Sequence, residues 1–137
     1  MELPFSGGCI CRAIRYQCTV RPLVMGNCHC RDCQYSSGTA FSSVLGVSAD
    51  SLTISGNTLK YYESMAESGE KVYRGFCSEC GTPVFAKSGA HPEFMGIKAA
   101  SLDDPSWFSP NTDIWTDSAQ PWHVMNPDTL KFPKELQ

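Results

Sequence analysis

Three cysteines lie within six residues of one another, at Cys28, Cys30 and Cys33. One residue separates the first two and two residues separate the second two. Thiolate sulfur is a soft ligand that suits zinc, which binds cysteine at about 2.3 Å in a tetrahedral arrangement. So many sulfur ligands in so short a segment predict a metal site that a tight turn brings together.

Two cysteine pairs lie elsewhere in the chain. Cys77 and Cys80 precede Gly81, and a Cys-x-x-Cys-Gly segment between two strands is typical of a zinc knuckle. The turn of a knuckle directs both sulfurs inward, and glycine tolerates the positive φ that such a turn requires. Cys9 and Cys11 are two residues apart, so in an extended strand they would share one face and could hold one metal from one side.

The eighth cysteine, Cys18, falls in an alternating segment. Ile14, Tyr16, Cys18 and Val20 alternate with more polar residues, which is the period of a half-buried strand. Cys18 lies on the apolar face of that strand. We expect it to be a small core residue, because free cysteine is among the most buried residue types.

The other seven cysteines divide into a group of four and a group of three. A structural zinc site is closed by four protein ligands, whereas a site with three ligands leaves a position for water or substrate. The two pairs supply four sulfurs and would close one site, which leaves the triple at residues 28–33 as the open one. We therefore expect two zinc ions per chain, one structural and one catalytic.

Other assignments of the triple stay open at this stage. His29 or His123 could complete it as a second closed site. The triple could instead give two sulfurs to the Cys-x-x-Cys pair as in a zinc ribbon, although 43 intervening residues exceed the usual spacing. A thioredoxin-like role for Cys30 and Cys33 would need a βαβ pattern, which the flanking sequence lacks.

The remaining pattern predicts short strands separated by turns. We expect strands over 39–47, 71–76, 83–86 and 94–98, a hairpin of 52–54 and 59–62 across 55–57, a helical turn over 34–38, and a turn with a short helix over 103–108. The rest of the chain towards its C-terminus is rich in aromatic residues and proline and is expected to be irregular. The sequence thus predicts a mainly β fold in one domain over 1–137.

Composition excludes several classes of function. The net charge is −3 and no run of Lys or Arg occurs, which argues against nucleic-acid binding. No apolar stretch approaches the length of a membrane span, and the first residues carry no signal-peptide pattern, so we expect a cytoplasmic protein. In a reducing compartment, closely spaced cysteines are metal ligands or catalytic groups more often than structural disulfides.

These motifs, in this order and spacing, resemble the glutathione-dependent formaldehyde-activating enzyme family, which also includes centromere protein V. The matching segments are GGCIC (7–11), IRY (14–16), CHCRDC (28–33), SG (37–38) and FCSECG (76–81), with LDDP (102–105) and PWH (121–123) as later landmarks. One departure is visible, because Arg12 stands where the family usually has glycine.

The resemblance implies a β-tent fold of short antiparallel strands stapled by two zinc ions. It implies that Cys9, Cys11, Cys77 and Cys80 hold the structural zinc and that Cys28, Cys30 and Cys33 hold the catalytic one. The implied reaction is the reversible addition of the glutathione thiol to formaldehyde, giving S-hydroxymethylglutathione, which makes the chain a carbon–sulfur lyase with a small-molecule thiol as its partner.

Zinc suits this chemistry in two ways, by ionising the thiol or by polarising the carbonyl oxygen. Three thiolates leave the site a net charge of −1, which weakens the second effect, so we favour ionisation of the thiol. His123 could relay a proton or be structural, Arg31 could pair with a carboxylate of glutathione, and Asp32 could cap a turn.

Two other functions stay open: a binding module in which zinc only stiffens the fold, and a methionine sulfoxide reductase, which would need a reactive cysteine beyond the zinc ligands. The sequence does not predict the oligomeric state.

Overall fold

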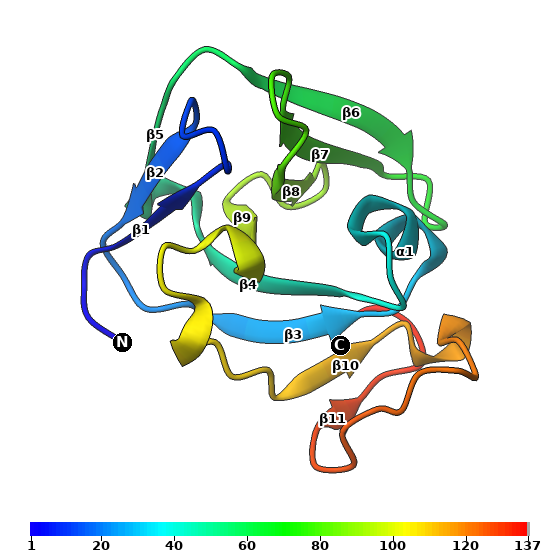
Figure 1. The fold of residues 1–137 in the computed structure, drawn as a ribbon. Helices are drawn as coiled ribbons and strands as arrows, with labels where there is room; N and C mark the ends of the chain where they lie inside the picture. The colour runs from blue at the N-terminus through cyan, green and yellow to red at the C-terminus, as the bar shows by residue number, and fades with distance from the viewer. Residues whose placement is uncertain (137) are drawn as a thin grey trace.

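The computed structural model describes residues 1–136, which form two β-sheets (Figure 1). The smaller sheet is antiparallel and has the strand order β1-β2-β5. Its strands are β1 (Phe5–Gly8), β2 (Arg15–Cys18) and β5 (Leu52–Ser55).

The larger sheet of the described chain has the strand order β11-β10-β3-β4-β9-β8-β7-β6. Its strands are β3 (Val24–Cys28), β4 (Ser42–Ser48), β6 (Leu59–Met65), β7 (Lys71–Cys77), β8 (Pro83–Ser88), β9 (Phe94–Lys98), β10 (Thr112–Ile114) and β11 (Leu130–Lys131). All neighbours pair antiparallel except β10, which runs parallel to β3 and to β11. The prediction of a mainly β fold of short antiparallel strands is confirmed.

The helical segments are short. They are α1 (Arg31–Ser37) and the 3-10 turns η1 (Ala49–Ser51), η2 (Ala99–Ser101), η3 (Pro105–Trp107) and η4 (Thr116–Ser118). The helical turn expected over 34–38 begins earlier, at Arg31, and ends as expected at Gly38, whose φ of 74° is left-handed. No helix within residues 1–136 has both the length and the apolar character to cross a bilayer.

The two sheets share one apolar core. Ile14 and Cys18 of the predicted alternating strand are fully buried and Tyr16 nearly so, which confirms that pattern and the core assignment of Cys18. Tyr16 packs against Phe85 of the larger sheet with ring centroids 5.4 Å apart. Val20 is the exception in this pattern, being 40% exposed, because the strand already ends at Cys18.

The hairpin expected over 52–62 is wrong. β5 pairs with β2 of the smaller sheet and β6 pairs with β7 of the larger one, so residues 56–58 carry the chain from one sheet to the other. A strand-turn-strand pattern is the same for a hairpin and for such a crossing. The pairing is decided here by contacts with residues far away in the sequence.

Three further strands lie where the sequence predicted none, two of them in the C-terminal segment that was expected to be irregular. β3 leads directly into the cysteine triple, and β10 and β11 lie in the proline-rich C-terminal segment. None of them shows apolar alternation, because β3 is half-buried throughout and β10 and β11 are only three and two residues long. Their pairing is therefore visible only in the folded chain.

Gly7 provides a test of how the smaller sheet packs. A Cβ atom at this position would overlap the Tyr16 hydroxyl and the Ser101 carbonyl oxygen. The Tyr16 hydroxyl also bonds to Ser101 Oγ, which joins the smaller sheet to η2. We expect Gly7→Ala to lower the free energy of unfolding by about 1–3 kcal/mol, measured by urea denaturation, since overpacking displaces its neighbours. Ser6→Ala in the same strand is the control and should change it by less than about 0.5 kcal/mol. Equal stability of the two variants would contradict this packing.

Candidate metal centres

Four cysteine sulfurs meet where the turn after β1 touches the turn between β7 and β8. The sulfurs of Cys9, Cys11, Cys77 and Cys80, here called the four-sulfur group, all lie within 4.8 Å of one another. Cys11 Sγ lies 3.6 Å from Cys9 Sγ and 3.7 Å from Cys77 Sγ. Sulfurs at about 2.3 Å from a tetrahedral zinc are about 3.8 Å apart, whereas a disulfide bond is about 2.0 Å long. The spacing fits metal ligands.

The first pair of this group lies in a turn, so the expectation that it lies in an extended strand is wrong. The Arg12 amide donates to the Cys9 carbonyl at 3.0 Å, which closes the turn. Arg12 has a φ of 66° and so occupies the left-handed region that favours glycine. This explains why a glycine is usual at this position, and the turn forms with arginine nevertheless.

The second pair forms the expected knuckle. Gly81 has a φ of 79°, and its amide donates to the Cys77 carbonyl at 2.8 Å. The Glu79 amide approaches Cys77 Sγ at 3.4 Å, and the Thr82 hydroxyl lies 3.1 Å from Cys80 Sγ. The hydrogen bond from Thr82 lowers the pKa of Cys80 to about 5. These donors favour the thiolate, which is the form that binds metal.

The three-sulfur group consists of Cys28, Cys30 and Cys33, whose sulfurs also lie within 4.8 Å of one another. Cys28 ends β3, Cys30 is the N-cap of α1, and Cys33 lies in its first turn. The Cys33 amide donates to Cys30 Sγ at 3.3 Å, so the residue that caps this helix is Cys30 and not Asp32, the residue that the sequence offered as a possible cap. The start of a helix thus folds the three sulfurs together.

No fourth Cys, His, Asp or Glu within residues 1–136 joins the three-sulfur group. His29 is fully buried, and its Nε2 lies 2.6 Å from Asp113 Oδ1 on β10. The His123 ring packs against Phe41 at 4.7 Å and against His29 at 5.5 Å between ring centroids. Neither histidine completes this group, and the group is separate from the four-sulfur group.

Charges around the three-sulfur group favour an anion. Hydrogen bonds from the Cys28 and Cys30 thiols hold the pKa of Cys33 far below its ordinary value, and the positive charges of Lys98 and Arg74 act in the same direction. Lys98 is only 6% exposed, and its Nζ lies 2.7 Å from Ser42 Oγ. Burial lowers the pKa of Lys98, while the charge of Cys33 opposes this shift.

Sequence reasoning did not identify Lys98, Arg74 or Asp113. The sequence does contain a pattern that could have identified Lys98 as a functional residue. It is the lone charged residue in an otherwise apolar strand and lies between Ile97 and Ala99. Arg74 and Asp113 lie on β7 and β10, and nothing in their local sequence relates them to residues 28–33.

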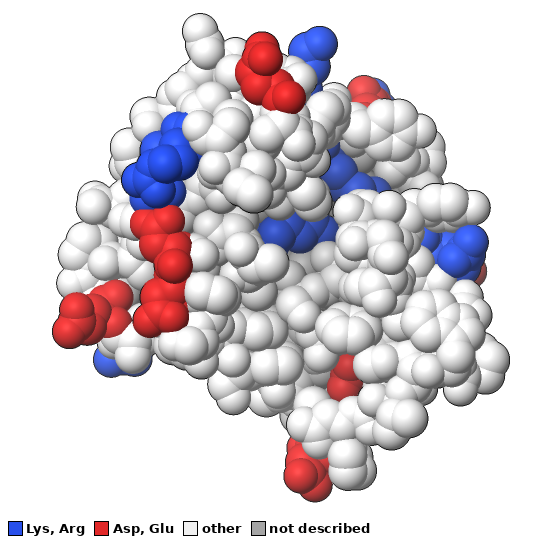
Figure 2. All heavy atoms as spheres, in the orientation of Figure 1, with Lys and Arg blue, Asp and Glu red and all other residues white. Residues whose placement is uncertain are grey.

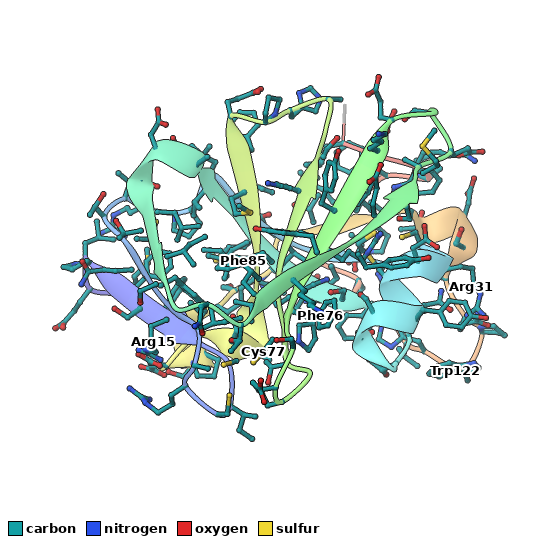
Figure 3. The ribbon with its side chains drawn as sticks, turned by 90° about the horizontal axis from the view of Figure 1, so that it is seen from above. Arg15, Arg31, Phe76, Cys77, Phe85 and Trp122 are labelled. Carbon is teal, nitrogen blue, oxygen red and sulfur yellow. The ribbon has the colours of Figure 1, made fainter. Side chains whose placement is uncertain are left out.

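Arg31 does not face the sulfurs. Its Nη1 donates to Gln34 Oε1 at 2.6 Å, and its guanidinium lies 4.7 Å from the centre of the Tyr35 ring. Figure 3 shows Arg31 on the outer side of α1, near Trp122. Gln34 is buried and in turn donates to the His29 carbonyl at 2.7 Å, so this network ties Arg31 on the surface of α1 to the segment that precedes the helix.

Comparison with known proteins relates the chain to one family. The family model described as "Glutathione-dependent formaldehyde-activating enzyme" matches residues 4–118, a range that includes both sulfur groups. A "Putative glutathione-dependent formaldehyde-activating enzyme" of Penicillium rubens is 28% identical over 114 residues, which cover 77% of this chain and 59% of that protein. An "Uncharacterized lyase" of Schizosaccharomyces pombe is 28% identical over 94 residues, covering 66% of this chain and 64% of that protein.

The chain therefore spans about six tenths of the length of these relatives. A crystal structure of a Rhodobacter sphaeroides protein has the same fold, with a TM-score of 0.59 and 16% identity over 93% of this chain and 98% of that one. The family model covers most of the sequence and includes all seven cysteines that form the two groups. The chain belongs to the glutathione-dependent formaldehyde-activating enzyme family.

Proposed function

We propose that this chain is a zinc-dependent carbon–sulfur lyase that forms and cleaves the adduct of a small thiol, such as glutathione, with formaldehyde. The observation that carries the proposal is the unequal pair of sulfur groups, one with four sulfurs and one with three. The names of the family and of the relatives support the same reaction. We infer a reducing compartment such as the cytoplasm, because closely spaced cysteines serve there as metal ligands more often than as disulfides.

The donor sets fit two zinc ions in different roles. The four-sulfur group would hold a structural zinc, and Cys28, Cys30 and Cys33 would hold a catalytic zinc with one position left for substrate. Zinc bound there would supply a Lewis acid that keeps a neighbouring thiol ionised near neutral pH.

The chain's own residues prepare the site for an anion. As zinc ligands the three cysteines would be thiolates and would make the site negative, and the positive charges of Lys98 and Arg74, which lower the pKa of Cys33, would offset part of this charge. An approaching thiolate therefore meets less repulsion than the cysteines alone would impose.

In the reaction, the substrate sulfur forms a bond to the formaldehyde carbon. The electron pair of the C=O π bond moves to the oxygen, which takes up a proton, so the thiol proton is the only group that the addition has to relocate. The half-buried His123 ring, which lies beside Phe41, is a candidate to carry that proton.

The structure disfavours a methionine sulfoxide reductase, which would need a reactive cysteine outside the metal ligands. Cys18 is the one cysteine outside both groups, and it is fully buried. Its sulfur lies 3.4 Å from Ser51 Oγ and 3.5 Å from the Val20 carbonyl oxygen. A buried thiol of this kind is inert towards a bulky substrate.

Serine substitutions distinguish the roles of the two sulfur groups. We expect Cys77→Ser to prevent folding, because binding of a structural zinc is folding free energy. We expect Cys30→Ser to fold, to retain one zinc per chain and to lose activity. The measurements are zinc content and the dispersion of the NMR spectrum.

Cys18→Ala is the matched control and should retain two zinc ions per chain. An unfolded Cys30→Ser protein would mean that the three-sulfur group is structural, and a single zinc in the unmodified protein would contradict the division into two sites.

Exchange spectroscopy by NMR tests the reaction itself. In a mixture of formaldehyde and glutathione, we expect the protein to accelerate interconversion of free and hydroxymethylated thiol beyond the spontaneous rate. Cys30→Ser should give only the spontaneous rate. If a protein with both zinc ions bound gives no acceleration, the lyase proposal fails, and a zinc-stiffened binding module becomes the better account.

A further inference from the structure

Two cationic side chains near the three-sulfur group form no salt bridge with a carboxylate within residues 1–136. Lys98 is 6% exposed and is held by the hydroxyls of Ser42 at 2.7 Å and Ser36 at 3.5 Å. Arg74 donates to Ser64 Oγ at 3.1 Å, and its buried Nε has no partner in the described chain. No carboxylate of the described residues neutralises these buried or half-buried cations, so both can receive an anionic ligand beside the sulfurs.

Lys98 lies in the wall of a cavity of about 310 Å³. Hydroxyl groups surround it, from Ser36, Ser42, Ser43 and Ser101, and Phe41 forms an apolar side. Among residues 1–136, no acidic side chain lines this cavity. Figure 2 shows Lys or Arg atoms at the bottom of a hollow near the middle of the face in view. A single cation among hydroxyl donors suits a carboxylate.

Arg74 lies in the wall of a second cavity, of about 360 Å³. This cavity combines the Arg74 guanidinium with the Asp32 carboxylate, and its other lining residues are Tyr35, Ser36, Tyr62 and Ser64. A cation and an anion in one cavity match a group that carries both charges, and an α-amino acid has an ammonium and a carboxylate on one carbon atom.

Ser36 on α1 lines both cavities. Ser36 donates to the Cys33 carbonyl at 3.2 Å, so this shared wall is attached to the three-sulfur group. A ligand that fills both cavities would therefore pass close to the site that we propose for the thiol.

We propose that the two cavities bind the two charged ends of a peptide thiol, with a terminal carboxylate at Lys98 and an α-amino acid group between Arg74 and Asp32. Glutathione has this arrangement, because its glycine carboxylate and its γ-linked glutamyl group stand on opposite sides of the cysteine thiol. The inference rests on the proposed function for the substrate class and adds the residues that select the thiol.

Binding of S-methylglutathione tests the inference without using the reaction, because its blocked sulfur cannot ionise. Titration followed by NMR or calorimetry should show binding to the unmodified protein. S-methyl-γ-glutamylcysteine, which lacks the glycine carboxylate, and S-methylcysteinylglycine, which lacks the glutamyl group, should each bind at least about tenfold more weakly. These comparisons need no mutant.

Matched variants assign each end of the ligand. Lys98→Met should weaken S-methylglutathione binding at least about tenfold and should abolish the preference for it over S-methyl-γ-glutamylcysteine. Arg74→Met should abolish the preference over S-methylcysteinylglycine. Lys60→Met and Arg21→Met, at exposed positions elsewhere, should leave binding unchanged.

The outcomes separate this inference from the lyase proposal. If the unmodified protein binds the truncated ligands as well as S-methylglutathione, or does not bind S-methylglutathione, the inference is wrong even where catalysis occurs with simple thiols. If the ligand preferences hold but exchange between formaldehyde and glutathione is not accelerated, the inference stands and the lyase proposal falls.

Discussion

The arrangement of the molecule depends on the contact of four sulfurs between the turn after β1 and the turn between β7 and β8. This contact joins the smaller sheet to the larger sheet through residues that lie 66 positions apart in sequence. The Tyr16 hydroxyl adds a second link, at 2.8 Å from Ser101 Oγ, and Ser101 in turn bonds to the Lys98 carbonyl. The smaller sheet is thus linked through Tyr16 and Ser101 to the end of β9, where Lys98 lies.

The three-sulfur group is supported differently, from the C-terminal segment. β10 runs parallel to β3, and Asp113 on β10 holds His29 between two of the cysteines. Gln34 bonds to the Ser118 carbonyl at 3.1 Å and accepts a bond from Gln120 at 2.9 Å. Burial opposes ionisation of Asp113, but its hydrogen bonds with His29 and Thr129 prevail and hold its pKa below the ordinary value. The supports surround the sulfurs without adding a fourth ligand within residues 1–136.

The spacing of cysteines in short stretches of sequence predicted the groupings that form within one turn or one helix start. The sulfurs of 28–33 are brought together by one helix start, and the knuckle at 77–81 by one turn, so their patterns are visible in short windows of sequence. Partners distant in sequence were not predictable in this way. The pairing of β5 with β2, the strand β10 and the cations Lys98 and Arg74 all depend on tertiary contacts. The apolar alternation at Ile14 and Tyr16 located a core strand but did not identify its neighbour.

X-ray absorption at the zinc edge tests the central claim, which is that one metal site is closed by sulfur and the other is open. Seven sulfurs shared by two ions average 3.5 per ion in the zinc-loaded protein. We expect that value, without the outer-shell scattering of an imidazole ring, and a rise towards four when glutathione is added. Imidazole scattering, or a sulfur number that glutathione leaves unchanged, would contradict the account.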